Sequence, residues 1–270
     1  MGGKLKPFLI FFFYILTAHA QTLSPGGRTK ALHSQSALIL DNAGTVFTNP
    51  ALLPQLPLCT TWFNVFNPYQ LKEVQSIASA INYSNGVYGI GIGFWQLGHK
   101  LYKEQIVNLA LSRAIFHDVS AGITVKYRRI DIARYGSAGH FLFDLGIHVP
   151  LSSKMNFGAR LVNFHNTALA ESGDEFKREL ISALKIATIP DINLYIETAH
   201  VESQTPDLRF AATYSPIDFL QLRAGTGLNS SEIYSMGFCV NWNRMSFDYA
   251  LQNHTYLAQT HYFTFSLEIK

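Results

Sequence analysis

Apolar and polar residues alternate with a period of two through most of the chain. In the last segment, Phe263 and Phe265 occupy one phase and Thr264 and Ser266 the other. Successive side chains of a β-strand point to opposite faces, so this alternation is typical of strands with one apolar face. We therefore predict strands over residues 59–66, 74–84, 87–97, 103–113, 118–130, 138–149, 154–166, 178–188, 191–202, 206–215, 218–226, 231–241, 244–252 and 260–270.

These predicted strands number about fourteen, and their lengths point to a membrane. Many approach the ~9–11 residues that a tilted transmembrane strand needs, whereas ordinary globular strands have roughly 5–6. The connections alternate between short turns, such as 84–86 and 151–153, and longer polar loops, such as 131–137 and 167–177. We predict an all-β fold, a transmembrane antiparallel β-barrel over 59–270 whose short turns and chain ends are periplasmic. A soluble β-sandwich, which also alternates, is the alternative.

The first twenty residues have the pattern of a cleavable signal peptide. Lys4 and Lys6 precede the apolar run 8–16, and small residues around His19 precede Gln21. That run is shorter than the roughly 20 residues that a membrane helix needs, although an uncleaved anchor is the alternative. We predict a signal peptide at 1–20 and export to the outer membrane.

Composition supports a membrane barrel and excludes one class of partner. Charged residues make up 14% and aromatic residues 13% of the 270 residues, and no long apolar run follows Leu16. The net charge of +3 is not concentrated in any basic run, so we expect no nucleic-acid partner. Cys59 and Cys239 fall on strands that are not neighbours, which favours two separate small apolar side chains over a disulfide.

Residues 21–58 do not alternate and form a separate N-terminal segment. A short helix or an irregular strand is expected within 29–40, and 41–44 has the composition of a turn. Proline disfavours helix at the residue before it, so Asn49-Pro50 interrupts the segment. We predict a hatch or plug segment over 21–58.

This segment resembles the N-terminal region of the PorV/PorQ group within the FadL-like outer-membrane proteins. The matching residues are Gly27, Arg28, Ala31, Leu40, Asp41, Asn49, Pro50, Ala51 and Leu53. The carboxyl-terminal ranges 247–251 and 260–267 are also similar to that group. The resemblance implies a FadL-like barrel of fourteen strands with the segment folded into the lumen, where Asp41, Asn49, Pro50 and Ala51 form the hatch motif.

The sequence contains no convincing catalytic constellation. No paired Cys-x-x-Cys or His-Glu-x-x-His offers metal spacing, and no cofactor motif is present. The glycines at 89, 91 and 93 lie inside an alternating strand with no helix after it, so we interpret them as small inward residues that make room in a lumen. We therefore predict no enzyme, no catalytic residue, no metal and no cofactor. An outer-membrane phospholipase or protease barrel is the alternative.

Charged residues take the inward phase of several predicted strands. The candidate lumen groups are Lys126, Arg128, Asp144, Arg160, Glu197, Arg209, Arg223 and Asp248. Buried charges must pair or stay hydrated. These groups can bind the hatch, bind a solute or line a hydrated interior, and the sequence leaves these alternatives open. We predict that Asp41 and Asn49 bond to lumen groups.

Two functions follow from these predictions. The PorV/PorQ resemblance implies a non-enzymatic barrel associated with type IX protein secretion, and this is the main prediction. The alternative is a FadL-like channel for uptake of small hydrophobic molecules. The expected partners are outer-membrane lipid, the barrel assembly machinery, and either secretion components or a small hydrophobic solute.

Overall fold

The computed structural model describes residues 24–116, 118–165, 167–168, 175–202, 204–230 and 232–269. The predicted signal peptide at 1–20 lies outside the described residues, as do the first three residues of the predicted hatch. Within the described ranges, no helix is both long and apolar enough to cross a membrane.

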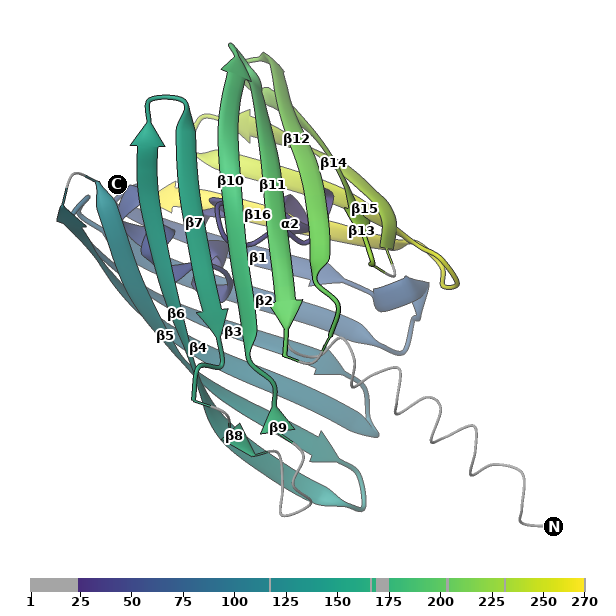
Figure 1. Cartoon of the computed structure of the whole chain (residues 1–270). Helices are drawn as coiled ribbons and strands as arrows, with labels where there is room; N and C mark the ends of the chain where they lie inside the picture. The colour runs from purple at the N-terminus through teal and green to yellow at the C-terminus, as the bar shows by residue number, and fades with distance from the viewer. Residues whose placement is uncertain are drawn as a thin grey trace.

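Fourteen antiparallel strands form one closed barrel, as the alternation predicts (Figure 1). The first seven are β1 (Cys59–Phe66), β2 (Gln75–Ser84), β3 (Tyr88–Gly98), β4 (Tyr102–Phe116), β5 (Val119–Ile132), β6 (Gly136–Ser152) and β7 (Met155–Val162). The other seven are β10 (Glu179–Ile189), β11 (Ile192–Val201), β12 (Asp207–Ile217), β13 (Leu220–Leu228), β14 (Glu232–Trp242), β15 (Met245–His254) and β16 (Thr260–Ile269). Pairing of β1 with β16 closes the sheet, which rules out the sandwich.

The outer surface of the barrel carries the apolar phase of each strand. On β3, for example, Ile90 and Ile92 are exposed, whereas the alternating Gly91 and Gly93 face the interior. Exposed Leu109, Phe210 and Phe265 continue this outer surface on other strands. Large apolar side chains on nearly every strand face outward, where a soluble protein would expose them to water at a cost. The fold is therefore that of a membrane-spanning barrel.

Connections alternate in length as the sequence predicts. At one rim the turns are short, as at Gly86, whose φ of 82° suits an Asn-Gly turn; the Asn85 side chain accepts hydrogen bonds from two backbone N–H groups there. The longer connections lie at the opposite rim. In outer-membrane barrels the short-turn rim is periplasmic and the long-loop rim is extracellular, and we predict the same orientation for this chain.

Strand lengths differ from the prediction on one side of the barrel. Strand β6 has 17 residues and β4 has 15, several more than expected, because both continue beyond the membrane-facing part of the wall. Strand β7 was expected to reach 166 but ends at Val162, where Asn163 adopts a left-handed φ of 51°. A separate two-stranded ladder, β8 (Thr167–Ala168) with β9 (Glu175–Phe176), follows.

The N-terminal segment lies inside the barrel. It contains the helix α2 (Gly27–Ala31) and two 3₁₀ helices, η1 (Asn42–Phe47) and η2 (Pro50–Gln55), which the strands enclose in Figure 1. A third 3₁₀ helix, η3 (Pro68–Gln70), follows β1. The helix is shorter than the sequence suggests, and the predicted turn at 41–44 begins a 3₁₀ helix instead. We call the described part, residues 24–58, the hatch.

Inward glycines give the hatch its room. A Cβ atom added at Gly91 would lie 2.3 Å from Val46, and one added at Gly93 would lie 2.7 Å from Phe47. Side chains at these positions would occupy the space that the hatch fills. The inward glycines of β3 thus face η1, which supports their interpretation as residues that make room in the lumen.

The two cysteines are both free. Cys59 lies on β1 and Cys239 on β14, and β16 and β15 separate these strands. The structure therefore confirms that the cysteines are not on neighbouring strands and do not form a disulfide.

Candidate functional site

The candidate site is the interface between the hatch and the polar inner face of the barrel. Asn49 is fully buried at the start of η2. Its Nδ2 donates to the carbonyl oxygens of Ala37 at 2.8 Å and Ile147 at 3.2 Å, and its Oδ1 accepts from the Ala51 N–H at 3.0 Å. One amide therefore links two turns of the hatch to β6.

Pro50 and Ala51 continue this contact along the wall. The Ser120 hydroxyl of β5 donates to the Ala51 carbonyl oxygen at 2.6 Å. Gly122, two residues further along β5, faces the Pro50–Ala51 peptide so closely that an added Cβ would lie 2.8 Å from the Pro50 carbonyl carbon. The motif residues thus pack backbone against backbone on β5.

A first charged cluster surrounds Asp248 on β15. This buried carboxylate accepts from Arg223 and, at 3.4 Å, from Arg28 of the hatch. Arg28 also donates to the Leu40 carbonyl oxygen at 2.8 Å. Two cations thus share one carboxylate, and one of them belongs to the hatch.

Asp41 lies at the edge of this cluster. Its carboxylate is 4.0 Å from the Arg28 Nε, and the Trp62 Nε1–H donates to it at 3.4 Å. Burial raises the pKa of the Asp41 carboxyl to about 7, and the nearby Arg28 offsets only part of this effect. Burial therefore favours the neutral form of Asp41, whereas Arg28 and the Trp62 N–H favour its charged form.

A second cluster joins β5, β6 and β7 through Asp144. This carboxylate is fully buried and forms ion pairs with Lys126 and, at 2.8 Å, with Arg160. Arg160 also donates to the Phe47 carbonyl oxygen at the end of η1, at 3.2 Å. The cluster therefore binds the hatch through the backbone of Phe47.

A third cluster uses Glu197 on β11 to hold the hatch by its backbone. One carboxylate oxygen accepts from the N–H groups of both Ser36 and Ala37, each at 2.8 Å. Arg209 on β12 pairs with the same carboxylate at 3.3 Å and donates to the Ser34 carbonyl oxygen at 3.1 Å. Donors and acceptors of an irregular segment are satisfied here without secondary structure.

Arg128, the last of the predicted lumen groups, contacts β4 and the connection after β7. Its Nε lies 2.7 Å from a carboxylate oxygen of Glu104 on β4, and its guanidinium lies 4.9 Å from the centre of the Phe176 ring. The structure thus places seven of the eight lumen candidates in three hatch-binding clusters and Arg128 beside the connection after β7.

Sequence reasoning missed one residue of this interface, Arg28, and two neighbours of Arg128, Glu104 and Phe176. Arg28 was noted only within the resemblance, although it pairs with Asp248. Glu104 was overlooked, although it shares the inward phase of its strand with Asn108, so alternation could have found it. Phe176 lies in a non-alternating stretch that offers no such signal.

The barrel wall has an uneven section next to these clusters. Towards the long-loop rim, β6 pairs with β5 as far as Gly136. On its other side, β6 pairs with β7 only as far as Leu145. Strand β7 has only 8 residues, and beyond its end the chain is held to β6 by a hydrogen bond from the Phe164 N–H to the Phe143 carbonyl oxygen at 3.0 Å. Strand β1 also has 8 residues, but its neighbours β2 and β16 have 10 residues each, so the three strands are of similar length. We call the section between outer β6 and β10 the low wall.

Phe176 fills the inner side of the low wall. It is 5% exposed, its ring lies 5.7 Å from that of His140 on β6, and Asn163 donates to its carbonyl oxygen. The ring thus packs against two inward-facing side chains of neighbouring strands, Arg128 of β5 and His140 of β6.

The arrangement suits a plug rather than a reaction centre. Most charged groups in the interface are neutralised by a partner, and the carboxylates are occupied by arginine, lysine or backbone N–H groups. In the part of the chain that the structure describes, no group of three His, Cys, Asp or Glu side chains could hold a metal ion. A polar cavity of about 300 Å³ lies at the short-turn rim between Arg28 of the hatch and Arg244.

Replacing Asn49 with alanine is expected to lower the free energy of unfolding by about 2 kcal/mol, because two buried carbonyl groups and one N–H lose their partner. Denaturant unfolding in detergent, followed by tryptophan fluorescence, measures this loss. Gln75→Ala, which removes an exposed amide on β2, is the matched control. Equal stability of the two variants would show that the Asn49 contacts contribute nothing.

Comparison with known proteins identifies the fold. Neither a known protein family nor a curated protein sequence matches the chain. The Ralstonia pickettii toluene transporter TbuX is 10% identical with a TM-score of 0.70, covering 91% of this chain and 98% of that one. The Pseudomonas putida toluene transporter TodX is 9% identical with a TM-score of 0.68, covering 90% and 98%. A Pseudomonas aeruginosa FadL homologue is 9% identical with a TM-score of 0.65, covering 93% and 99%.

These likenesses reach beyond the barrel. Residues 59–270 are 212 of the 270 residues, or about 79%, so coverage of 91% must include part of the chain that precedes β1. The chain therefore has the FadL-like fold of an outer-membrane β-barrel. These three structures give no support to the PorV/PorQ part of the resemblance or to type IX secretion.

Proposed function

We propose that the chain is a non-enzymatic channel that admits small hydrophobic molecules through the outer membrane. The observation that carries the proposal is the likeness to transporters described as carrying toluene, over more than nine-tenths of the chain. Two features of the chain support it: a lumen closed by a hatch, and a low wall beside it.

A hydrophobic molecule needs a route that avoids the charged lumen. The three charged clusters make the direct path through the barrel polar, and apolar molecules gain nothing by leaving lipid for such a path. We propose that hydrophobic molecules enter instead from the side of the barrel, at the low wall. We therefore assign entry to the low wall and assign closure of the direct path to the hatch.

The secretion-associated function ranks second. It was inferred from the PorV/PorQ resemblance, and no contact or surface in the described residues favours it specifically. Outer-membrane lipid and the barrel assembly machinery remain proposed partners of either function.

Uptake by intact cells tests the proposal, because an outer membrane is the barrier that such a channel overcomes. Cells lacking their own hydrocarbon channel and producing the full chain are expected to take up radiolabelled toluene or oleate faster than cells without it. Equal uptake in the two cell types, with the barrel present in the outer membrane, would contradict the proposed function.

Phe176→Ala tests the route. Removing the ring is expected to raise uptake severalfold, because it removes the side chain that packs on Arg128 and His140 at the inner face of the low wall. Phe210→Ala, which removes a lipid-facing ring on β12, is the control and should leave uptake unchanged. If the native chain supports uptake but Phe176→Ala does not alter it, the route is wrong while the function stands.

A further inference from the structure

On the outer surface of β3 to β6, the side chains change from apolar to polar between one outward-facing position and the next, two residues further along the strand. The last large apolar side chains on this surface are Phe94, Val107, Tyr127 and Phe141, all exposed. Two residues further along β3, β4 and β5, on the same outward face, stand Gln96, Gln105 and Arg129. Because the lipid-facing band of a barrel ends in aromatic residues at the interface, the Tyr127–Phe141 pair marks the edge of the hydrocarbon layer.

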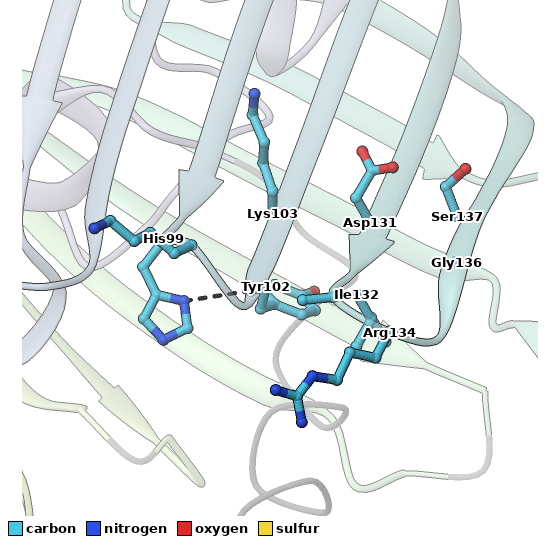
Figure 2. A pocket seen from close by; sticks show the side chains of 10 residues that line it. His99, Tyr102, Lys103, Asp131, Ile132, Arg134, Gly136 and Ser137 are labelled. Carbon is cyan, nitrogen blue, oxygen red and sulfur yellow. Dashed lines mark hydrogen bonds between the residues drawn. The ribbon is translucent and has the colours of Figure 1, made fainter.

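One further step outward, the three adjacent strands form a hollow. Lys103, Asp131 and Ser137 are register partners on β4, β5 and β6, and Figure 2 shows their side chains projecting the same way. The loops add His99 and Arg134 at its lower edge in that view. The hollow has a volume of about 490 Å³, and Lys100 also lines it. We call it the outer hollow.

The outer hollow and the arginine beside it carry an excess of positive charge. Lys100, Lys103, Arg129 and Arg134 give four cations against the single carboxylate of Asp131, a net charge of +3 (4 − 1). Arg129 binds that carboxylate with a shortest distance of 2.9 Å. Within the described residues, no carboxylate forms an ion pair with Lys100, Lys103 or Arg134, so three cations face solvent together.

A serine hydroxyl adds a donor to the hollow, and a histidine orders the loop beside it. The Ser137 hydroxyl lies on the strand next to Asp131. The His99 ring accepts from the backbone N–H groups of Leu101 and Tyr102 through its Nδ1, which fixes the loop that carries Lys100. A cluster of cations with a hydroxyl donor suits an oxyanion such as phosphate.

We infer that the outer hollow binds the phosphorylated headgroup of an anionic lipid in the outer leaflet. The position favours a lipid over a free anion, because the apolar surface from Phe94 to Phe141 lies directly below the cations on the same strands. Acyl chains on that surface place a headgroup at the level of Lys103. Basic residues next to a hydrophobic span attract anionic lipid headgroups by this combination of forces.

The inference is independent of the proposed transport function. It uses side chains on the outer face of β3 to β6, whereas transport was assigned to the low wall and the hatch. A lipid fixed at this position would support the extended ends of β4 to β6 above the membrane.

Binding of lipid A tests the inference. The full chain in detergent micelles is titrated with bisphosphorylated lipid A and with its fully dephosphorylated form, and bound lipid is counted by native mass spectrometry. The triple variant Lys100→Gln, Lys103→Gln and Arg134→Gln is expected to bind the phosphorylated form at least about tenfold more weakly than the native chain. The dephosphorylated form should bind both proteins at that reduced level.

A charge-matched control removes three cations elsewhere: Lys72→Gln, Lys154→Gln and Arg178→Gln, all on exposed residues. This control should bind phosphorylated lipid A like the native chain. An equal loss in the control, or equal binding of the two lipid forms by the native chain, would overturn the inference. Displacement of the lipid by an equimolar amount of inorganic phosphate would also overturn it, since the site would then recognise the free anion.

Discussion

Replacing Asp248 with alanine is expected to lower the free energy of unfolding by about 3–5 kcal/mol, the cost of removing one partner from a buried ion pair. Asp248 is fully buried and accepts from both Arg28 and Arg223. Alanine removes the ion pair of Arg223 and leaves Arg28 with the Asp41 carboxylate, 4.0 Å away, as its remaining carboxylate partner. Denaturant unfolding in detergent measures the loss, and the heat-dependent gel mobility of folded barrels reports on the same transition.

Asp131→Ala provides the matched control for this experiment. Asp131 also pairs with an arginine, but that pair is exposed to solvent, so its loss should cost less than about 1 kcal/mol. A similar loss in the two variants would mean that burial does not set the strength of the Asp248 cluster. Arg28→Ala should cost less than Asp248→Ala, because Arg223 then still neutralises the carboxylate.

A valine at Gly122 is expected to detach the hatch from β5 and to lower the free energy of unfolding by about 3 kcal/mol, near the upper end for overpacking. The added Cβ would lie 2.8 Å from the Pro50 carbonyl carbon and 2.9 Å from the Ala51 nitrogen. Both are backbone atoms, so no side-chain rotation relieves the clash. The hatch must move away.

Thiol labelling measures this movement. Ala51→Cys, introduced into a chain in which Cys59 and Cys239 are serine, is buried in the native packing and should react slowly. Adding Gly122→Val should make the thiol react rapidly with a water-soluble reagent. Ala121→Val, the neighbouring position on the lipid-facing side of β5, should leave the reaction slow; rapid labelling with both valines would attribute the effect to general loss of structure.

Much of the fold follows from the sequence because alternation is a local property. Each strand of a barrel must place apolar groups in lipid and small or polar groups in the lumen, so β15 and β16 show their two faces without any knowledge of their neighbours. The turn at Asn85-Gly86 is equally local. Strand number and pairing order then follow from antiparallel neighbours joined by short turns.

The ends of β4, β6 and β7 could not be placed from the sequence for a physical reason. Alternation continues where a strand leaves the membrane, so it does not show that β6 extends to Gly136. The end of β7 depends on Asn163, whose left-handed backbone is held by a hydrogen bond from its N–H to Asp144 and by its side-chain bond to Phe176. These are tertiary contacts that a local pattern does not contain.

The sequence predicts which charged residues face the lumen, but it does not predict which of them form ion pairs with each other. Inward charges such as Asp144 and Glu197 stand out because a polar phase on a barrel strand must face the lumen. Which cation meets which carboxylate depends on the path of an irregular segment, and Arg28 meets Asp248 across 220 residues of chain. Glu197 binds backbone N–H groups, for which a sequence gives no sign at all.

The partners of the hatch bear on how the protein is assembled. The hatch is synthesised before any strand, yet the Gly27 N–H donates to Thr264 on the last strand, and the His33 N–H donates to Ser235 on β14. Contacts between such distant parts of a chain form late, because a long loop must close first. The hatch, which is synthesised first, is therefore among the last parts to reach its native position. A hatch bound to Thr264 requires that the last strand is already paired in the barrel.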